Sequence, residues 1–274
     1  MERGPRARGA TLAWATYDWA NSAFATTVVA GFFPAFFKDY WSGELAVTES
    51  TFWLGAALTV AGATVAATAP VLGGIADRAA SKKKFLGAFA ALGASATAGL
   101  TLVGEGRWPL ALALYVVAYV GWLSSLIFYD ALLPAVSDAR NVDRVSSLGF
   151  ALGYLGGGLL FALQVAWFLA PATFGFGEGG EGTIAAVKAS FASVALWWAA
   201  FSIPLFARVP EPGAERAVPL GEAARSGLRE TVETFREARR TPGVLPFLGA
   251  YWLYIDGVDT VIVMAVDFGK AIGS

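Results

Sequence analysis

The chain has 274 residues, of which 56% are apolar, and a mean hydropathy of +0.57, whereas soluble domains contain about 45–50% apolar residues. It contains no cysteine and no histidine, which excludes disulfides, thiolate nucleophiles, Cys or His metal sites and histidine acid–base chemistry. The lack of both residues argues against an enzyme, and we expect no cofactor and no metal. No basic stripe is present, so no nucleic-acid partner is expected.

Seven apolar stretches alternate with charged connections along the chain. Most are near the ~20 residues that cross a ~30 Å hydrocarbon core as a helix. They run over 11–37, 52–75, 85–103, 109–133, 147–170, 185–206 and 246–268. The pattern predicts an all-α integral membrane protein. Its parts are a six-helix bundle over 1–206, a linker over 207–246 and a seventh transmembrane helix in 247–274.

The basic residues gather on every second connection. With the N-terminus in the cytoplasm, sixteen of the 20 Lys and Arg residues lie inside, and Lys38, Arg107, Lys188 and Lys270 lie outside. The opposite orientation would violate the positive-inside rule at every loop. The sequence therefore predicts a multi-pass membrane protein whose N-terminus and 207–246 linker are cytoplasmic.

The first apolar stretch contains an acidic residue in the run Tyr17-Asp18-Trp-Ala-Asn21-Ser22. Asp18 is ten residues past Arg8, about 15 Å along a helix, which predicts a position near the midplane of the bilayer. The amide and hydroxyl that follow at i+3 and i+4 share its helical face. Because ionisable groups in a membrane are costly, we expect these four polar residues to line a substrate or proton pathway. The alternative is that they only hydrogen-bond neighbouring helices.

The connection between the second and third spans reads Gly73-Gly-Ile-Ala-Asp77-Arg78-Ala-Ala-Ser-Lys82. It resembles the Gly-x-x-x-Asp-Arg-x-Gly-Arg-Lys loop of the major facilitator superfamily, with alanine and serine in place of that family's second glycine and its following arginine. In that family the loop helps to latch the two halves of the transporter. The resemblance therefore implies a gating role for Gly73, Asp77, Arg78 and Lys82. A plain positive-inside cluster would explain the lysines but not the Gly-x-x-x-Asp-Arg run.

Two further runs, Tyr17–Phe24 and Gly149–Gly157, narrow the resemblance. They are similar to the superfamily branch that includes the fungal vacuolar amino-acid effluxer linked to autophagy, and its bacterial relatives. The resemblance covers the whole chain, but only the first half of such a transporter plus its seventh helix. It implies a secondary transporter of a bacterial inner membrane that works by alternating access and exports amino acids or other small metabolites. Residues 110–129 contain no basic side chain, unlike the fourth span of the superfamily's drug antiporters.

The linker contains an amphipathic pattern over 220–240, in which apolar residues recur at helical spacing among five arginines. The pattern predicts a helix that lies along the inner membrane surface. The alternative is a solvated linker helix.

The seventh span repeats the pattern of the first, in the run Trp252-x-x-x-Asp256-x-x-Asp259-Thr260. This is typical of a parallel internal repeat with a site at the midplane between the halves. We expect Asp18 and Asp256 to face one another across a cavity, with Asp259 beside them. Two carboxylates in one low-dielectric cavity disfavour double ionisation, so one would carry a proton and couple transport to a proton gradient.

The chain ends soon after the seventh span, which predicts that a C-terminal half of the same protein completes the transporter. The expected partners are then this half, the lipid bilayer, a small-molecule substrate and a coupling ion such as H+. The alternative function is a non-transporting membrane receptor or scaffold on the same fold. A water-accessible cavity at Asp18 would favour transport, and a dry, fully paired Asp18 would favour the scaffold.

Overall fold

The computed structural model describes the backbone of residues 5–78, 81–211 and 218–273; the side chains of 5–7, 259 and 262–273 lie outside the description. Within these ranges the regular structure is entirely helical and contains no strand. The all-α class predicted from the hydropathy pattern is thereby confirmed.

The first apolar stretch forms one continuous helical span, Arg8–Trp41, which is longer than the predicted 11–37. Its four segments are α1 (Pro5–Ala23), η1 (Phe24–Phe32), α2 (Phe33–Phe36) and η2 (Phe37–Trp41). Both η1 and η2 are π-helical, a rare geometry that frequently occurs at functional sites. Pro34 lacks the N–H needed to continue an α-helical ladder, which is a physical reason for irregular turns beside it.

Five further helical spans in the described part of the chain are long and apolar enough to cross a membrane, and they overlap the second to sixth predicted stretches. They are α3 (Val47–Arg78), α4 (Lys82–Gly99) continued by η3 (Leu100–Leu102), α5 (Trp108–Asp130), α7 (Val142–Leu169) and α8 (Gly179–Arg208). The short segments α6 (Leu133–Val136) and η4 (Pro171–Phe174) lie in the connections.

Two helices follow the bundle. The first, α9 (Leu220–Arg240), covers the same residues as the predicted amphipathic helix, and the second is α10 (Val244–Gly273). Within α10, residues Val244–Val258 form an apolar helix in the part whose side chains are described. The helix α10 as a whole contacts η1 and α2 of the first span.

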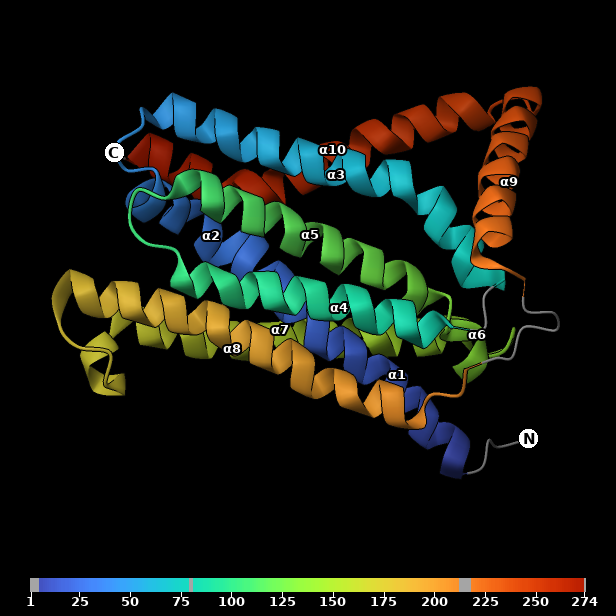
Figure 1. Cartoon of the computed structure of the whole chain (residues 1–274), viewed down its shortest axis with the longest axis horizontal. Helices are drawn as coiled ribbons and strands as arrows, with labels where there is room; N and C mark the ends of the chain where they lie inside the picture. Colours follow the sequence, from blue (N-terminus) through green and yellow to red (C-terminus); the bar gives the residue numbers. More distant parts are fainter. Residues whose placement is uncertain (1–4, 79–80, 212–217, 274) are drawn as a thin grey trace.

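The long helices run side by side, and α9 stands across one end of them (Figure 1). The same end holds the start of α1, the end of α3, the start of α4, and α6. The C-terminus lies at the opposite end. The connections predicted to be rich in basic residues therefore share one end of the molecule, here termed the α9 end.

The first span is the centre of the bundle and α3 is at its edge. In the most apolar 18-residue segment of each span, 67% of the first span is buried, compared with only 17% of α3. Large aromatic side chains on the first span are enclosed, and Phe33 stacks on Tyr115 of α5 with ring centroids 4.0 Å apart. Polar groups on α1 are consequently enclosed by other helices, whereas much of α3 is open to lipid or to other partners.

Candidate functional site

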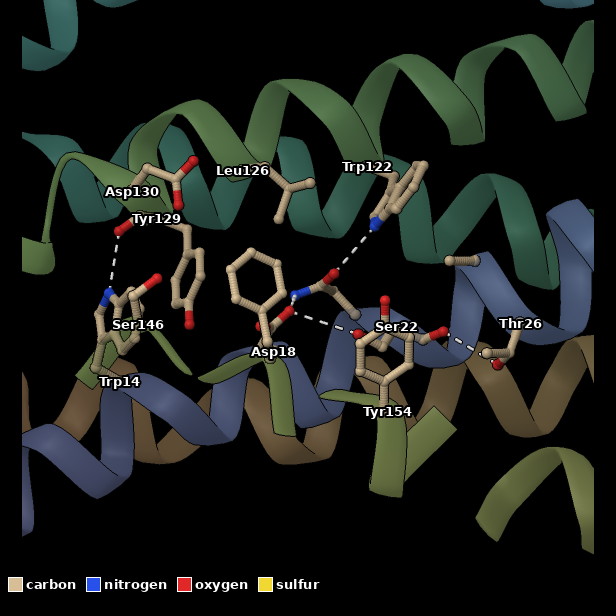
Figure 2. A pocket seen from close by; sticks show the side chains of 13 residues that line it. Trp14, Asp18, Ser22, Thr26, Trp122, Leu126, Tyr129, Asp130, Ser146 and Tyr154 are labelled. Carbon is tan, nitrogen blue, oxygen red and sulfur yellow. Dashed lines mark hydrogen bonds between the residues drawn. The ribbon is translucent and has the colours of Figure 1, made fainter. Parts of the chain in front are cut away.

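A pocket of about 320 Å³ lies between α1, α5 and α7 (Figure 2). Three residues that the sequence predicts for the pathway line it from α1: Asp18, Asn21 and Ser22. The other walls carry aromatic rings and a second carboxylate, Asp130, at the end of α5.

Asp18 is half-buried, and its carboxylate makes only weak hydrogen bonds. Its Oδ1 atom accepts two long hydrogen bonds of 3.5 Å, from Asn21 Nδ2 and Ser22 Oγ. Among the described residues neither Asp18 nor Asp130 has an ion-pair partner. A carboxylate in a membrane-spanning helix with so little compensation is expected to serve a ligand or a proton.

Glycines on α7 bring this helix against the polar face of α1. A Cβ atom at Gly153 would lie 2.6 Å from Ser22 Oγ and 3.2 Å from Asp18 Cγ. One at Gly149 would lie 3.0 Å from the Tyr129 hydroxyl oxygen. The 2.6 Å distance is shorter than real Cβ contacts and the other two are tight, so glycine at these positions leaves room for the Ser22 hydroxyl and the Asp18 carboxylate. This gives a reason for the small-residue run that the sequence shows in the fifth span.

Asn21 connects α1 to α5 and is buried, with 2% exposure. Its Nδ2 atom donates to the Tyr17 carbonyl at 2.8 Å, and its Oδ1 atom accepts from Trp122 Nε1 at 3.0 Å. Both polar atoms are therefore engaged within the protein. The amide holds Asp18 and Trp122 in place and has little capacity left for a ligand.

Two tyrosines lie beside Asp18 in different environments. Tyr17 is in the core, where its hydroxyl donates to Ser125 Oγ at 2.8 Å and accepts from Trp198 Nε1 at 3.4 Å. Tyr129 is 3% exposed and lines the pocket, and its hydroxyl has no hydrogen-bond partner among the described residues. Its ring stacks on Trp14 with centroids 4.3 Å apart. The free hydroxyl at the pocket thus belongs to Tyr129, while Tyr17 is tied into the core.

Several pocket residues were not singled out for the site from the sequence: Trp14, Trp122, Tyr129, Asp130 and Tyr154. The sequence feature that could have pointed to them is Asp130, because it is an acidic residue at the end of an apolar stretch. Helical spacing cannot show that this face of α5 meets α1, because α5 is apolar on nearly every side.

The described side chains give no evidence that the acidic residues of the seventh span line this pocket. Asp256 is exposed on α10, and the pocket lining contains no α10 residue. The side chain of Asp259 lies outside the described residues. The meeting of Asp18 with the seventh span stays a prediction.

The predicted gating residues lie at the α9 end, where α9 crosses α3. A Cβ atom at Gly74 would lie 2.6 Å from Gly227 Cα, so the two helices touch backbone to backbone. Beside this crossing, Arg78 forms an ion pair with Glu230 of α9. Gly73 and Asp77 line a hollow at the same crossing.

Lys82 is the first residue of α4, and its neighbour Lys83 bonds to the segment after α8. The backbone N–H of Lys83 donates to Glu211 at 3.0 Å, and its ammonium donates to the Phe206 carbonyl at 3.0 Å. The basic run therefore attaches the start of α4 to the end of α8.

Comparison with known proteins finds a matching family and relatives that are named as an effluxer or a transporter. A family model described as "Vacuole effluxer Atg22 like" matches residues 6–272. An "Uncharacterized MFS-type transporter YxiO" of Bacillus subtilis (strain 168) is 33% identical over 261 residues, covering 95% of this chain and 60% of that protein. "Autophagy-related protein 22-2" of Aspergillus clavatus is 31% identical over 137 residues, which are 46% of this chain and 21% of the fungal protein. No solved structure matches significantly.

Proposed function

Because the chain belongs to the Atg22-like vacuole effluxer family, we propose that it forms the N-terminal part of a secondary transporter that works by alternating access. It is a multi-pass membrane protein with six span-length helices among its described residues. The chain spans about 60% of the length of its Bacillus relative. We propose that a C-terminal half of the same protein supplies the other wall of the pathway.

The observation that carries the proposal is the pocket at Asp18. It is lined by an acidic side chain without an ion-pair partner in the described chain, and by Phe150 and Tyr154, which are largely exposed. A scaffold would favour a dry and fully paired carboxylate instead. An open, mostly apolar pocket that contains a carboxylate suits a substrate or proton that must enter and leave.

The proposed cargo is an amino acid or another small metabolite, moved outward. The family description supports export, because it names a vacuole effluxer. Asp18 is the proposed substrate or proton contact on this half. Asp256 and Asp259 are its proposed counterparts on α10, supported by the matching sequence pattern and by the contact of α10 with the first span. H+ is the proposed coupling ion, carried by these carboxylates.

The proposed gate is the crossing of α3 with α9. Asp77 and Arg78 lie at the end of α3, and the Arg78–Glu230 ion pair ties that end to α9. Gly73 and Lys82 flank the same connection. Opening of the pathway at the α9 end would require this contact to change, because α9 lies across the end of the bundle (Figure 1).

The test uses the full-length protein in proteoliposomes with a pH gradient and a mixture of labelled amino acids. Asp18→Asn is expected to reduce gradient-driven transport by about tenfold or more, because the substitution keeps the shape of the side chain and removes its charge. Thr16→Ala on the same helix is the control, since its hydroxyl only bonds the Leu12 carbonyl one turn away. Equal transport by Asp18→Asn and the parent would overturn the role of the pocket.

The proposed orientation places the α9 end in the cytoplasm of a bacterial cell, as the positive-inside rule requires. The chain contains no cysteine, so a single Ser226→Cys substitution on α9 gives one reporter. An impermeant maleimide should label it in inverted membrane vesicles and not in intact cells. Labelling from outside intact cells would reverse the topology.

A further inference from the structure

We propose that the pocket between α1, α5 and α7 binds the cationic, ammonium-type group of the substrate, with Asp18 as its counter-ion. This inference rests on the proposed transport function and deepens it by naming the chemistry of the substrate. Charge, hydrogen-bonding capacity and aromatic surface each support it.

The charged residues in the pocket wall are both acidic. Asp18 and Asp130 approach the pocket from two different helices (Figure 2), and its lining contains no lysine or arginine. Neither carboxylate has an ion-pair partner among the described residues. In a low-dielectric bundle, such carboxylates attract a cation and repel an anion.

The hydrogen-bonding groups of the wall are mostly acceptors with free capacity. The Ser22 hydroxyl already donates to Asp18, and the Thr26 hydroxyl donates to the Ser22 carbonyl at 3.1 Å. Asp18 keeps free lone pairs, because its two hydrogen bonds are long. The buried Tyr129 hydroxyl has no partner in the described chain and offers a further oxygen at the same place. An N–H-bearing ammonium group can donate to these oxygens, and a quaternary one is held by charge alone. A carboxylate ligand could accept only from hydroxyls such as that of Tyr129 and would be repelled by Asp18.

Aromatic rings complete the surroundings of a cation. The indole N–H groups of Trp14 and Trp122 are occupied by the Tyr129 carbonyl at 3.1 Å and by Asn21. These two rings are thus held in fixed positions. The Trp14 ring is buried and stacked on Tyr129, so the partly exposed Trp122 ring provides the aromatic surface at the pocket. Tyr154 stands at the rim with 79% exposure, where it can cover a bound ligand. Aromatic rings around a carboxylate form a typical environment for an ammonium or quaternary ammonium group.

If the cargo is an amino acid, the pocket can hold only its ammonium group. Its carboxylate would then be bound by the second half of the transporter, which must supply a cation or a set of N–H donors. A cargo that carries only an ammonium group would need no such complement.

The test is equilibrium binding to the full-length protein in lipid nanodiscs, measured by ligand-observed NMR, so it does not require transport. The probes share one shape and differ in charge: choline, the neutral 3,3-dimethylbutan-1-ol and the anionic 3,3-dimethylbutanoate. Choline is expected to bind at least about tenfold more tightly than either isostere. Asp18→Asn is expected to weaken choline binding by about tenfold, and Tyr129→Phe by about threefold. Asp143→Asn, an exposed carboxylate at the start of α7, is the charge-matched control and should change nothing.

Equal binding of the three probes, no binding of any, or unchanged choline affinity in Asp18→Asn would each overturn the inference. If Asp18→Asn fails to fold, the discrimination among isosteres by the parent protein and by Tyr129→Phe still decides it. Selective choline binding by a protein that transports nothing would leave the inference standing and overturn the transport function. Transport of a substrate without a cationic group that is abolished by Asp18→Asn would overturn the inference and leave the transport function standing.

Discussion

Glycine brings helices into close contact at two places in this molecule, with different consequences. On α7, the missing Cβ of Gly153 leaves room for the side chains of Asp18 and Ser22. At the α9 end, Gly74 and Gly227 face each other, so two backbones meet with no side chain between them. The first contact makes space for the carboxylate that lines the pocket, and the second attaches a surface helix to the edge of the bundle. A glycine in a helix thus contributes to function according to what lies opposite it.

The largest effect is expected from filling the space at the pocket. Gly153→Ala would place a methyl group 2.6 Å from Ser22 Oγ and 3.2 Å from Asp18 Cγ, so the Ser22 and Asp18 side chains must turn away or α1 and α7 must separate. We expect a loss of stability of about 1–3 kcal/mol, typical of overpacking, together with loss of transport. Thermal unfolding in detergent and proteoliposome transport measure the two effects.

Gly158→Ala, five residues further along α7, is the matched control because its Cβ would have no atom within 4 Å. If the two variants behaved alike, the space at Gly153 would have no special role and the comparison would fail.

An intermediate effect is expected at the crossing of α3 and α9. Gly227→Ala would drive a methyl group into the backbone of α3, next to Gly74, and should detach α9 while the bundle stays folded. An Ala223→Cys reporter measures this, because Ala223 is fully buried in the contact and the chain has no other cysteine. Maleimide labelling should be slow alone and about tenfold faster with Gly227→Ala, as expected when a local contact opens.

Gly221→Ala, earlier on α9 with open space around its Cβ, should leave the labelling rate unchanged. Slow labelling in the Gly227→Ala background would show that the glycine contact does not hold α9.

The smallest effect is expected from the ion pair beside this crossing. The Arg78 and Glu230 side chains are 29% and 47% exposed, so solvent screens their attraction and the pair should contribute less than about 1 kcal/mol. A double-mutant cycle with Arg78→Ala and Glu230→Gln, read from Ala223→Cys labelling, measures the coupling. It should shrink further in high salt.

The exposed i,i+4 pair Arg229–Glu233 on α9 provides the reference value, since its N–O distance is 3.5 Å and it does not bridge two helices. A coupling of several kcal/mol between Arg78 and Glu230 would mean that the charges, rather than the glycines, hold α9.

The pocket shows how far sequence reasoning reaches. Asp18, Asn21 and Ser22 share a helical face at i, i+3 and i+4, so their common position at the pocket could be predicted from spacing alone. Tyr129 and Asp130 come from a helix more than 100 residues away in the chain, and periodicity cannot say which of its faces meets α1. The sequence also could not show that Tyr129 lines the pocket and Tyr17 does not. Tyr17 lies in the core because its hydroxyl is hydrogen-bonded to Ser125 and Trp198.

The sequence by itself determined the all-helical class, the six membrane-crossing helices of the described bundle and the position of the amphipathic helix. These follow from local properties, namely the length of each apolar run and the spacing of its residues. The tertiary structure decided which polar groups share a pocket, which of them stay free for a ligand and where α9 docks. Those outcomes depend on how the helices pack against one another. The packing in turn depends on small residues such as Gly153 and Gly227. Their effect can be judged only when the residues opposite them in the contact are known.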